Sequence, residues 1–347
     1  MPYVTASRLT RIAHDVLVKM GATEEEAATV AKHQIGANLA GHDSHGIILL
    51  ATYVTRIKQG HIVPGAKPEI LRESSTTAHI DGHWGFGQVV QTRAARLAIE
   101  KARQQMMGAV TVACQSHVGR LGDYPLMAAE AGMVGMLFCD SGRGPKVVVP
   151  FGGRDARLGT NPICIALPSN LEAPIFVDMA TSQVAANKMG VYRNRGKSIP
   201  PGWLVDKEGR PSTNPNDYFA GGAVLPLGGL DSGHKGYGLG TMVDVFAGIL
   251  TGLGWGLDPQ ARHNDGSLFI ALNVAAFRPL EDFKTEVTDF AKFLKSSRPA
   301  PGFTEVLYPG EIEWRTAQER LRAGVPIDDT TWKTIQDLAD SLGVSTT

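Results

Sequence analysis

Residues 41–46, with the sequence GHDSHG, place an acid, a hydroxyl and two imidazoles between two stretches of helical apolar spacing. Apolar residues recur at that spacing over 27–39 upstream and over 47–57 downstream. We therefore expect Ser44 to cap the second helix and His45 to lie in its first turn. The helix dipole disfavours a positive charge there, so the spacing predicts a lowered pKa for His45 and proton exchange near neutral pH.

Other chemistry is compatible with this segment. A Ser-His pair at a helix start is also the ordinary composition of a cap with an exposed neighbour. A hydrolase would use Ser44 as a nucleophile, but side chains at adjacent positions do not normally face each other, and no Gly-x-Ser-x-Gly elbow surrounds Ser44. An oxidoreductase, a Ser/His hydrolase and a binding protein without catalysis therefore remain as alternatives at this point.

Polar residues also follow two expected strands. Residues 115–122 (QSHVGRLG) lie between a strand ending near Ala113 and the next helix, the usual place for a ligand in an open α/β sheet. Arg120 in this block offers a planar, bidentate donor for a phosphate or a carboxylate. Asp178 ends another strand, where a carboxylate accepts hydrogen bonds from ribose hydroxyls.

Residues 233–240 (GHKGYGLG) are expected to open a helix that continues to about residue 250. Glycines and a lysine at a helix N-terminus favour an anion such as a phosphate, through free amides, the dipole and the ammonium. The spacing matches neither Gly-x-Gly-x-x-Gly nor a Walker loop, so a Rossmann fold is not indicated.

The segment 37–46 (ANLAGHDSHG) resembles the signature of the malate/L-lactate dehydrogenase type 2 family, which is unrelated to the ordinary lactate and malate dehydrogenases. Blocks at 117–122, 151–162, 174–182 and 233–240 extend the likeness over nearly the whole chain. Within the family, residues 41–47 and the block at 117–122 are most similar to the subgroup typified by hydroxycarboxylate dehydrogenase B.

The resemblance implies hydride transfer between NAD or NADP and a 2-hydroxy or 2-oxo carboxylic acid. It implies that His45 exchanges the proton, with Ser44 orienting it and His117 as a further catalytic candidate. It assigns cofactor contacts to His117, Gly119, Arg120, Leu121, Asp178, Met179, Ala180, His234, Lys235, Pro309, Gly310 and Glu311.

The sequence departs from the family at the substrate carboxylate. In much of the family an arginine lies four positions after the histidine, whereas this chain has Leu49. An apolar residue there predicts a substrate with an apolar or aromatic side chain. The carboxylate would then be held by Arg120 or Arg157, with Thr160 as a further substrate contact.

Three alternative substrates within the family are malate, lactate and a ureidoglycolate-type acid. An NADPH-dependent cyclic imine reductase ranks lower. Some imine-reducing relatives have an acid ten residues after the strand-end aspartate, and this chain has Lys188 there.

The expected elements alternate between strand and helix in the middle of the chain. Strands are expected at 78–82, 109–113, 134–138, 163–167 and 269–277, helices at 88–104, 122–131 and 281–295, and loops over 193–226. A strand, a helix and a strand from 78 to 113 predict a βαβ unit with parallel pairing. We therefore expect an α/β fold, non-Rossmann, with a largely parallel or mixed sheet.

Both ends of the chain are expected to be helical, and we infer that they form one discontinuous domain, 1–75 with 310–347. The family uses this domain for dimerisation, so a homodimer is implied. The nicotinamide-binding α/β domain would comprise 76–125 and 226–309, and a third, strand- and loop-rich domain 126–225.

Composition excludes several classes of partner. The 347 residues carry 34 basic and 34 acidic side chains with no long run of one sign, which argues against nucleic acid or a membrane surface. The N-terminus lacks a signal-peptide pattern, so a cytoplasmic protein is expected. The three cysteines are expected to be reduced and buried, and no metal-binding motif is present.

Overall fold

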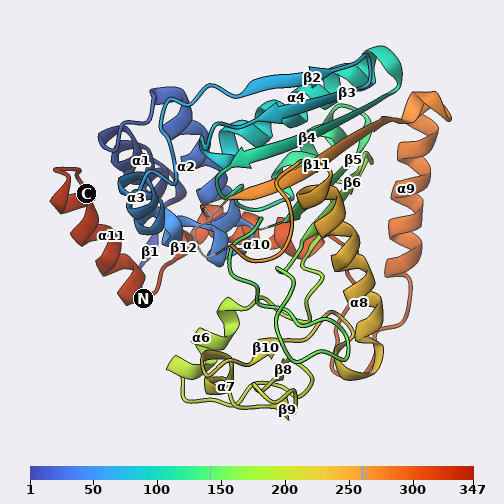
Figure 1. The fold of residues 1–347 in the computed structure, drawn as a ribbon. Coiled ribbons are helices and arrows are strands. Elements are labelled where there is room, and N and C mark those ends of the chain that lie inside the picture. The colour runs from blue at the N-terminus through green and yellow to red at the C-terminus, as the bar shows by residue number, and fades with distance from the viewer. Residues whose placement is uncertain (141, 259–261, 263) are drawn as a thin grey trace.

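The computed structural model describes residues 1–140, 142–258, 262 and 264–347 (Figure 1). Its centre is a 7-stranded sheet in the order β2-β3-β4-β11-β5-β6-β7. The strands are β2 (Glu69–Glu73), β3 (Thr77–Asp81), β4 (Met107–Gln115), β5 (Met133–Asp140), β6 (Ile163–Leu167), β7 (Ile175–Met179) and β11 (Asp265–Asn273). The pair β3-β4 is parallel and the other neighbours are antiparallel, so the predicted α/β fold with a mixed sheet is confirmed.

Two helices cover one face of this sheet. They are α4 (Gly87–Gln105), which connects the parallel strands β3 and β4, and α5 (Asp123–Glu130), which leads into β5. Alternate residues of β4, such as Val110 and Val112, point into a core shared with both helices. The predicted βαβ unit is thus present. The strand β11 then lies between β4 and β5, an order that local periodicity does not specify.

The two ends of the chain share a second, helical core. Its helices are α1 (Ala6–Lys19), α2 (Glu24–Leu39), α3 (Leu50–Lys58) and α11 (Asp329–Ser341), and β1 (Tyr3–Val4) pairs with β12 (Val325–Pro326). Buried residues from both ends, including Leu17, Val30 and Ile335, belong to one cluster. Figure 1 shows these first and last segments side by side.

The region predicted as loop over 193–226 contains regular structure, which corrects that expectation. It holds β8 (Leu204–Val205), β9 (Pro211–Ser212), β10 (Ala223–Val224) and α7 (Asn216–Phe219), preceded by α6 (Asn187–Asn194). Strands of two residues are too short to produce alternation in a sequence that is rich in Gly, Pro and Asn. A small core that includes Val148, Met189 and Leu204 packs them together.

The next elements return to the sheet. Helix α8 (Gly229–Asp244) begins before the predicted residue 233 and continues into a π-helical segment η3 (Val245–Ile249). Strand β11 begins at Asp265, and a 3-10 turn η4 (Val274–Ala276) follows it where the sequence had predicted strand. Helices α9 (Leu280–Lys295) and α10 (Glu311–Ala323) complete the chain before α11.

Cys139 and Cys164 are buried free thiols, and Cys114 is free and half-buried. No helix among the described residues combines the length and the apolar character needed to cross a bilayer.

Candidate functional site

The GHDSHG segment connects α2 to α3 through two short 3-10 turns, η1 (Asp43–His45) and η2 (Ile47–Leu49). Helix α3 begins only at Leu50, so Ser44 is not its cap, which corrects the prediction. The Ser44 Oγ instead lies 3.0 Å from Nδ1 of His45. The adjacent side chains therefore do meet, and the contact leaves Nε2 of the ring for a substrate atom.

Asn38 of α2 holds this loop in place. Its Nδ2 donates to Oδ1 of Asp43 at 2.7 Å, and its Oδ1 accepts from the amide of Ile47 at 2.8 Å. A Cβ at Gly46 would lie 2.2 Å from that Oδ1, so only glycine fits there. Arg320 of α10 makes a two-pronged ion pair with Asp43 at 2.6 and 3.0 Å, so the C-terminal end of the chain also braces the loop.

The pKa of His45 is lowered to about 4, chiefly by burial and further by the neighbouring charges of His42 and Arg120. The predicted direction is therefore confirmed, although its cause is burial and not a helix terminus. His45 is therefore neutral at pH 7, so its ring is free to accept a proton from a substrate.

His117 follows β4 and stacks on His45, with ring centroids 5.6 Å apart and planes 18° apart. The hydroxyl of Tyr53 lies 2.9 Å from Nδ1 of His117 and accepts a hydrogen bond from Nε2 of Gln88 at 2.6 Å. Burial raises the pKa of Tyr53, which keeps the phenol protonated. With Gln88 as its donor, Tyr53 donates to His117 and favours the tautomer protonated on Nε2.

The two imidazoles open onto a cavity of about 300 Å³. It brings together five of the predicted site residues: His45, His117, Gly119, Leu121 and Thr160. Val118, Cys139, Pro145, Val147 and Pro162 add apolar surface.

Two buried carboxyl groups that sequence reasoning missed also line this cavity. Asp265 accepts a 2.9 Å hydrogen bond from the amide of Val118, and burial raises its pKa to about 7. Asp140 ends β5, and burial, then the proximity of Asp244, raises its pKa to about 8. Lys146 Nζ lies 3.9 Å from Asp140. The sequence signal was an acid next to an apolar strand pattern, with Asp140 at the end of β5 and Asp265 at the start of β11.

A second cavity, of about 250 Å³, brings together Asp178, Pro309 and Gly310. The Asp178 carboxylate accepts from the amide of Gly122 at 2.7 Å, and burial raises its pKa. Met179 and Ala180 follow it, half-buried, at the end of β7.

Arg120 stands in the chain between Gly119 and Leu121, which line the first cavity, and it contacts residues that line the second. Its guanidinium contacts the ring of Phe176 at 5.2 Å, donates to Asp123 at 2.9 Å and lies 4.0 Å from Asp178. The buried Nε of Arg120 has no hydrogen-bond partner among the described residues. It is therefore a buried cation, paired with two carboxylates, that keeps one unused hydrogen-bond donor.

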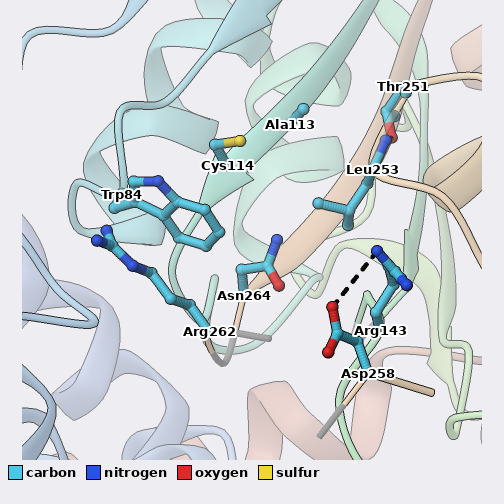
Figure 2. Close-up of a pocket in the computed structure, with 10 residues that line it drawn as sticks. Trp84, Ala113, Cys114, Arg143, Thr251, Leu253, Asp258, Arg262 and Asn264 are labelled. Atoms are coloured by element: carbon cyan, nitrogen blue, oxygen red, sulfur yellow. Dashed lines mark hydrogen bonds and ion pairs between the residues drawn. The ribbon is translucent and has the colours of Figure 1, made fainter. Parts of the chain in front are cut away.

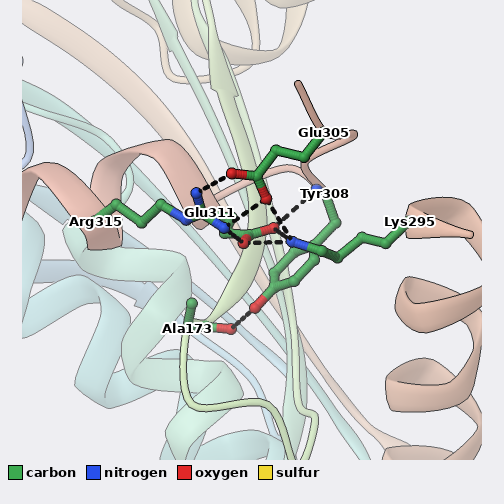
Figure 3. A network of polar contacts seen from close by, with 6 residues as sticks. All are labelled: Ala173, Lys295, Glu305, Tyr308, Glu311 and Arg315. Atoms are coloured by element: carbon green, nitrogen blue, oxygen red, sulfur yellow. Dashed lines mark hydrogen bonds and ion pairs between the residues drawn. The ribbon is translucent and has the colours of Figure 1, made fainter. Parts of the chain in front are cut away.

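Glu311 faces its own cations and not a cavity. Figure 3 shows its carboxylate held by Lys295 at 2.5 and 2.7 Å and by Arg315 at 2.6 Å, with Glu305 bridging the same two cations. This network ties α9 to the start of α10, next to Tyr308. The structure therefore assigns Glu311 a bracing contact.

Four other predicted residues lie apart from the cavity beside His45. Leu49 packs against the helical core. Arg157 is exposed and pairs with Asp155 at 3.1 Å. His234 and Lys235 are exposed and lie beyond the first turn of α8, which begins at Gly229, so the expected place at a helix N-terminus is wrong. The helix starts at Gly229, before the predicted residue 233, although glycine is a poor helix former.

A family model, sequence relatives and solved structures all match this chain over nearly its whole length. A family model described as malate/L-lactate dehydrogenase matches residues 4–336. The malate dehydrogenase of Pyrococcus horikoshii is 40% identical, with 98% of this chain and 96% of that protein covered. Hydroxycarboxylate dehydrogenase B of Escherichia coli K12 is 36% identical over 95% of this chain and 91% of its own.

Among solved structures, malate dehydrogenase from Entamoeba histolytica superposes with a TM-score of 0.93 at 33% identity, covering 99% of both chains. The match of the family model, the relatives and this fold lead to one conclusion: the chain belongs to the malate/L-lactate dehydrogenase family.

Proposed function

We propose that this protein is a nicotinamide-dependent dehydrogenase of 2-hydroxycarboxylic acids. The observation that carries the proposal is a neutral His45, with Ser44 on one ring nitrogen, stacked on His117 at the wall of a cavity. Because the lowered pKa keeps the ring unprotonated at neutral pH, His45 is available there as the acceptor of a proton from a substrate hydroxyl.

The residues present fit a dinucleotide. The two cavities suit the two ends of such a ligand. Arg120, which contacts residues of the second cavity and is next in the chain to residues of the first, keeps an Nε without a hydrogen-bond partner among the described residues for an anionic centre. We propose that His117, Gly119 and Leu121 hold one end of NAD or NADP, and that Asp178 through Ala180, with Pro309 and Gly310, hold the other. Bound there, the cofactor accepts or supplies the hydride.

In the oxidative direction, Nε2 of His45 takes the proton of the substrate hydroxyl while Ser44 keeps the ring in place. The Tyr53 and Gln88 pair fixes His117, which stacks on His45 in the wall of the same cavity. In the reductive direction His45 must first be protonated, and the negative charge of the substrate carboxylate raises its pKa toward that state.

We propose an apolar or aromatic substrate side chain. The cavity is lined mostly by apolar residues, and its two acids, Asp140 and Asp265, offer a second carboxylate no positive charge. Leu49 packs on the helical core and Arg157 points elsewhere, so Arg120 remains the candidate for the first carboxylate. Each buried methylene contributes about 0.8 kcal/mol, so a ring produces more than tenfold preference.

The test is a panel of 2-oxo acids assayed at 340 nm with NADH and with NADPH. Phenylpyruvate and long aliphatic 2-oxo acids should exceed oxaloacetate, pyruvate and other small substrates in kcat/KM. An enzyme that works best on oxaloacetate would contradict the apolar cavity. A best rate on a cyclic imine with NADPH would instead favour imine reduction, and labelling of Ser44 by a fluorophosphonate would favour a hydrolase.

We also propose that the chain forms a homodimer. The support is a run of exposed apolar side chains on α8 and η3: Leu239, Met242, Val245, Ile249 and Leu250. Such a continuous stripe is typical of a surface that a partner covers.

A further inference from the structure

A third cavity, of about 380 Å³, lies apart from the two described above (Figure 2). Its described lining residues come from the loop before α4, the end of β4, position 143 after β5, and positions 251–253, 258, 262 and 264 between η3 and β11. Asn264 lines it, whereas the next residue, Asp265, lines the cavity beside His45. Consecutive residues at the start of β11 therefore face different cavities.

Asn264 is the first sign of a ligand. It is 2% exposed, and its Nδ2 has no hydrogen-bond partner among the described residues. Figure 2 shows its amide between Trp84 and Leu253, inside the cavity. Because buried donors are almost always paired, this one marks the place of an acceptor oxygen.

The charges around the cavity favour an anion. Arg262 places its guanidinium 4.8 Å from the centre of the Trp84 ring, and Arg143 lies 3.5 Å from the Asp258 carboxylate (Figure 2). Among the described residues that line the cavity, two guanidinium groups against one carboxylate leave an excess of one positive charge. Cys114 adds no negative charge, because burial raises the pKa of its thiol.

The remaining wall is apolar and fixed. Trp84, Ala113 and Leu253 line it. Trp84 and Cys114 both have left-handed backbones, with φ of 62° and 52°, and the Trp84 amide donates to the Cys114 carbonyl at 2.6 Å. A tryptophan rarely adopts this conformation, and the hydrogen bond holds its indole in a defined position at the wall.

We propose that this cavity binds an aromatic monocarboxylate, with the carboxylate between Asn264 and the arginines and the ring against Trp84. The ligand is separate from the substrate and cofactor proposed above. Its single negative charge matches the excess positive charge of the described lining residues. One ring with a carboxylate also fits within the cavity volume.

Benzoate is the probe, because it has no 2-oxo group to react. Calorimetry on the full chain should give saturable binding, and benzamide and acetate, which lack the charge or the ring, should bind at least tenfold more weakly. The tryptophan fluorescence should change with benzoate and should stop changing in Trp84→Phe.

The variants locate the site. Asn264→Asp and Arg262→Gln should each weaken benzoate at least tenfold, while His45→Ala and the exposed control Arg298→Gln should keep the affinity. Thermal melting identifies a variant that fails to fold. If one of Asn264→Asp and Arg262→Gln does not fold, the benzoate affinity of the other tests the proposal. Absence of saturable benzoate binding, equal affinity in Asn264→Asp and Arg262→Gln, or loss in His45→Ala would each overturn the proposal.

Discussion

His45 and His117 stack on each other but have different proton partners. His45 shares Nδ1 with the hydroxyl of Ser44 at the protein surface, whereas His117 is paired with a buried phenol that Gln88 holds. A phenol of raised pKa does not give up its proton at neutral pH. His45 is therefore the ring that exchanges a proton with substrate, and His117 is held in one tautomer.

Replacing His45 with alanine should lower kcat by roughly 10²–10⁴-fold, because the proton acceptor is lost. The affinity for NADH or NADPH, measured by fluorescence titration, should change little. The matched control is His14→Ala, on α1, where the ring pairs with Asp15 and Glu24. Near-normal turnover in His45→Ala would move the assignment to His117.

The pH dependence of the oxidative rate should reflect the same group. With a pKa of about 4, His45 is a free base above pH 5, so kcat/KM should not fall between pH 7 and 5 on its account. If the base were a histidine with the ordinary pKa of about 6.5, kcat/KM would fall more than tenfold between pH 7 and pH 5. Steady-state rates of alcohol oxidation at constant ionic strength measure the profile, and a decline centred near pH 6.5 would contradict it.

Tyr53→Phe removes the phenolic oxygen between Gln88 and His117. The buried amide of Gln88 then loses its acceptor, so the free energy of unfolding in urea should fall by about 1–3 kcal/mol. The His117 ring also loses its donor, and kcat should fall while melting remains cooperative. Tyr3→Phe, at an exposed tyrosine, is the control and should change neither. Unchanged stability and turnover in Tyr53→Phe would mean that the phenol does not hold His117.

The residue types in the sequence pointed to His45 and His117 as candidate site residues. They did not point to the side chains around them, such as Tyr53 and Asp265. Tyr53 occupies an apolar position of α3 in the sequence pattern, so nothing marked its hydroxyl as functional. Asp265 reaches Val118 across 147 positions, and such a contact depends on the strand order. The causes of the pKa shifts are tertiary, and the local pattern could give only the direction for His45.

At the scale of elements, the connection from α2 to α3 differs most from expectation. A serine before an apolar run predicts a helix cap, but two 3-10 turns are found there. Asn38 bonds both ends of the turn, and Arg320 reaches Asp43 from 277 positions away. These long-range bonds outweigh the local preference for a cap. By contrast, the capping box of α2, in which Thr23 and Glu26 bond each other's backbone amides, is entirely local.

Asn38→Ala should therefore loosen this connection. In this variant the Ile47 amide loses its acceptor and Asp43 loses a donor. The free energy of unfolding in urea should therefore fall by about 1–3 kcal/mol. Turnover should also fall, because Ser44 and His45 lie between the two anchored residues. Asn170→Ala, at an exposed asparagine, is the control. Full activity with unchanged stability in Asn38→Ala would show that the loop holds its shape without this side chain.

At the scale of the whole molecule, helices at both ends of the sequence correctly predicted a core that the ends share. The sheet was predictable only in part. Local alternation identified β3, β4, β5 and β6, but β11 enters the middle of the sheet from far along the chain. The domain boundaries at 75, 125, 225 and 309 remain predictions.

The surface of the whole molecule also bears on its assembly. The sequence predicted dimerisation through the helical ends, yet the apolar stripe on α8 and η3 lies on another part of the chain, with Met242 49% and Ile249 51% exposed. Buried against a second copy, such side chains each contribute about 1.5–3 kcal/mol. Charged side chains in their place would lose that contribution and leave a buried charge unpaired.

The double variant Met242→Glu/Ile249→Glu should therefore dissociate the homodimer into monomers, measured by light scattering after size-exclusion chromatography. Both side chains are exposed in the single chain, so circular dichroism should show the fold unchanged. The matched control, Leu321→Glu, changes an exposed leucine of α10 in the helical part and should remain dimeric. If the control dissociates and the double variant does not, the interface lies on the helical ends, as the sequence predicted. If the wild-type chain is monomeric at micromolar concentration, both proposed dimer interfaces are wrong. The exposed stripe on α8 would then need a different partner.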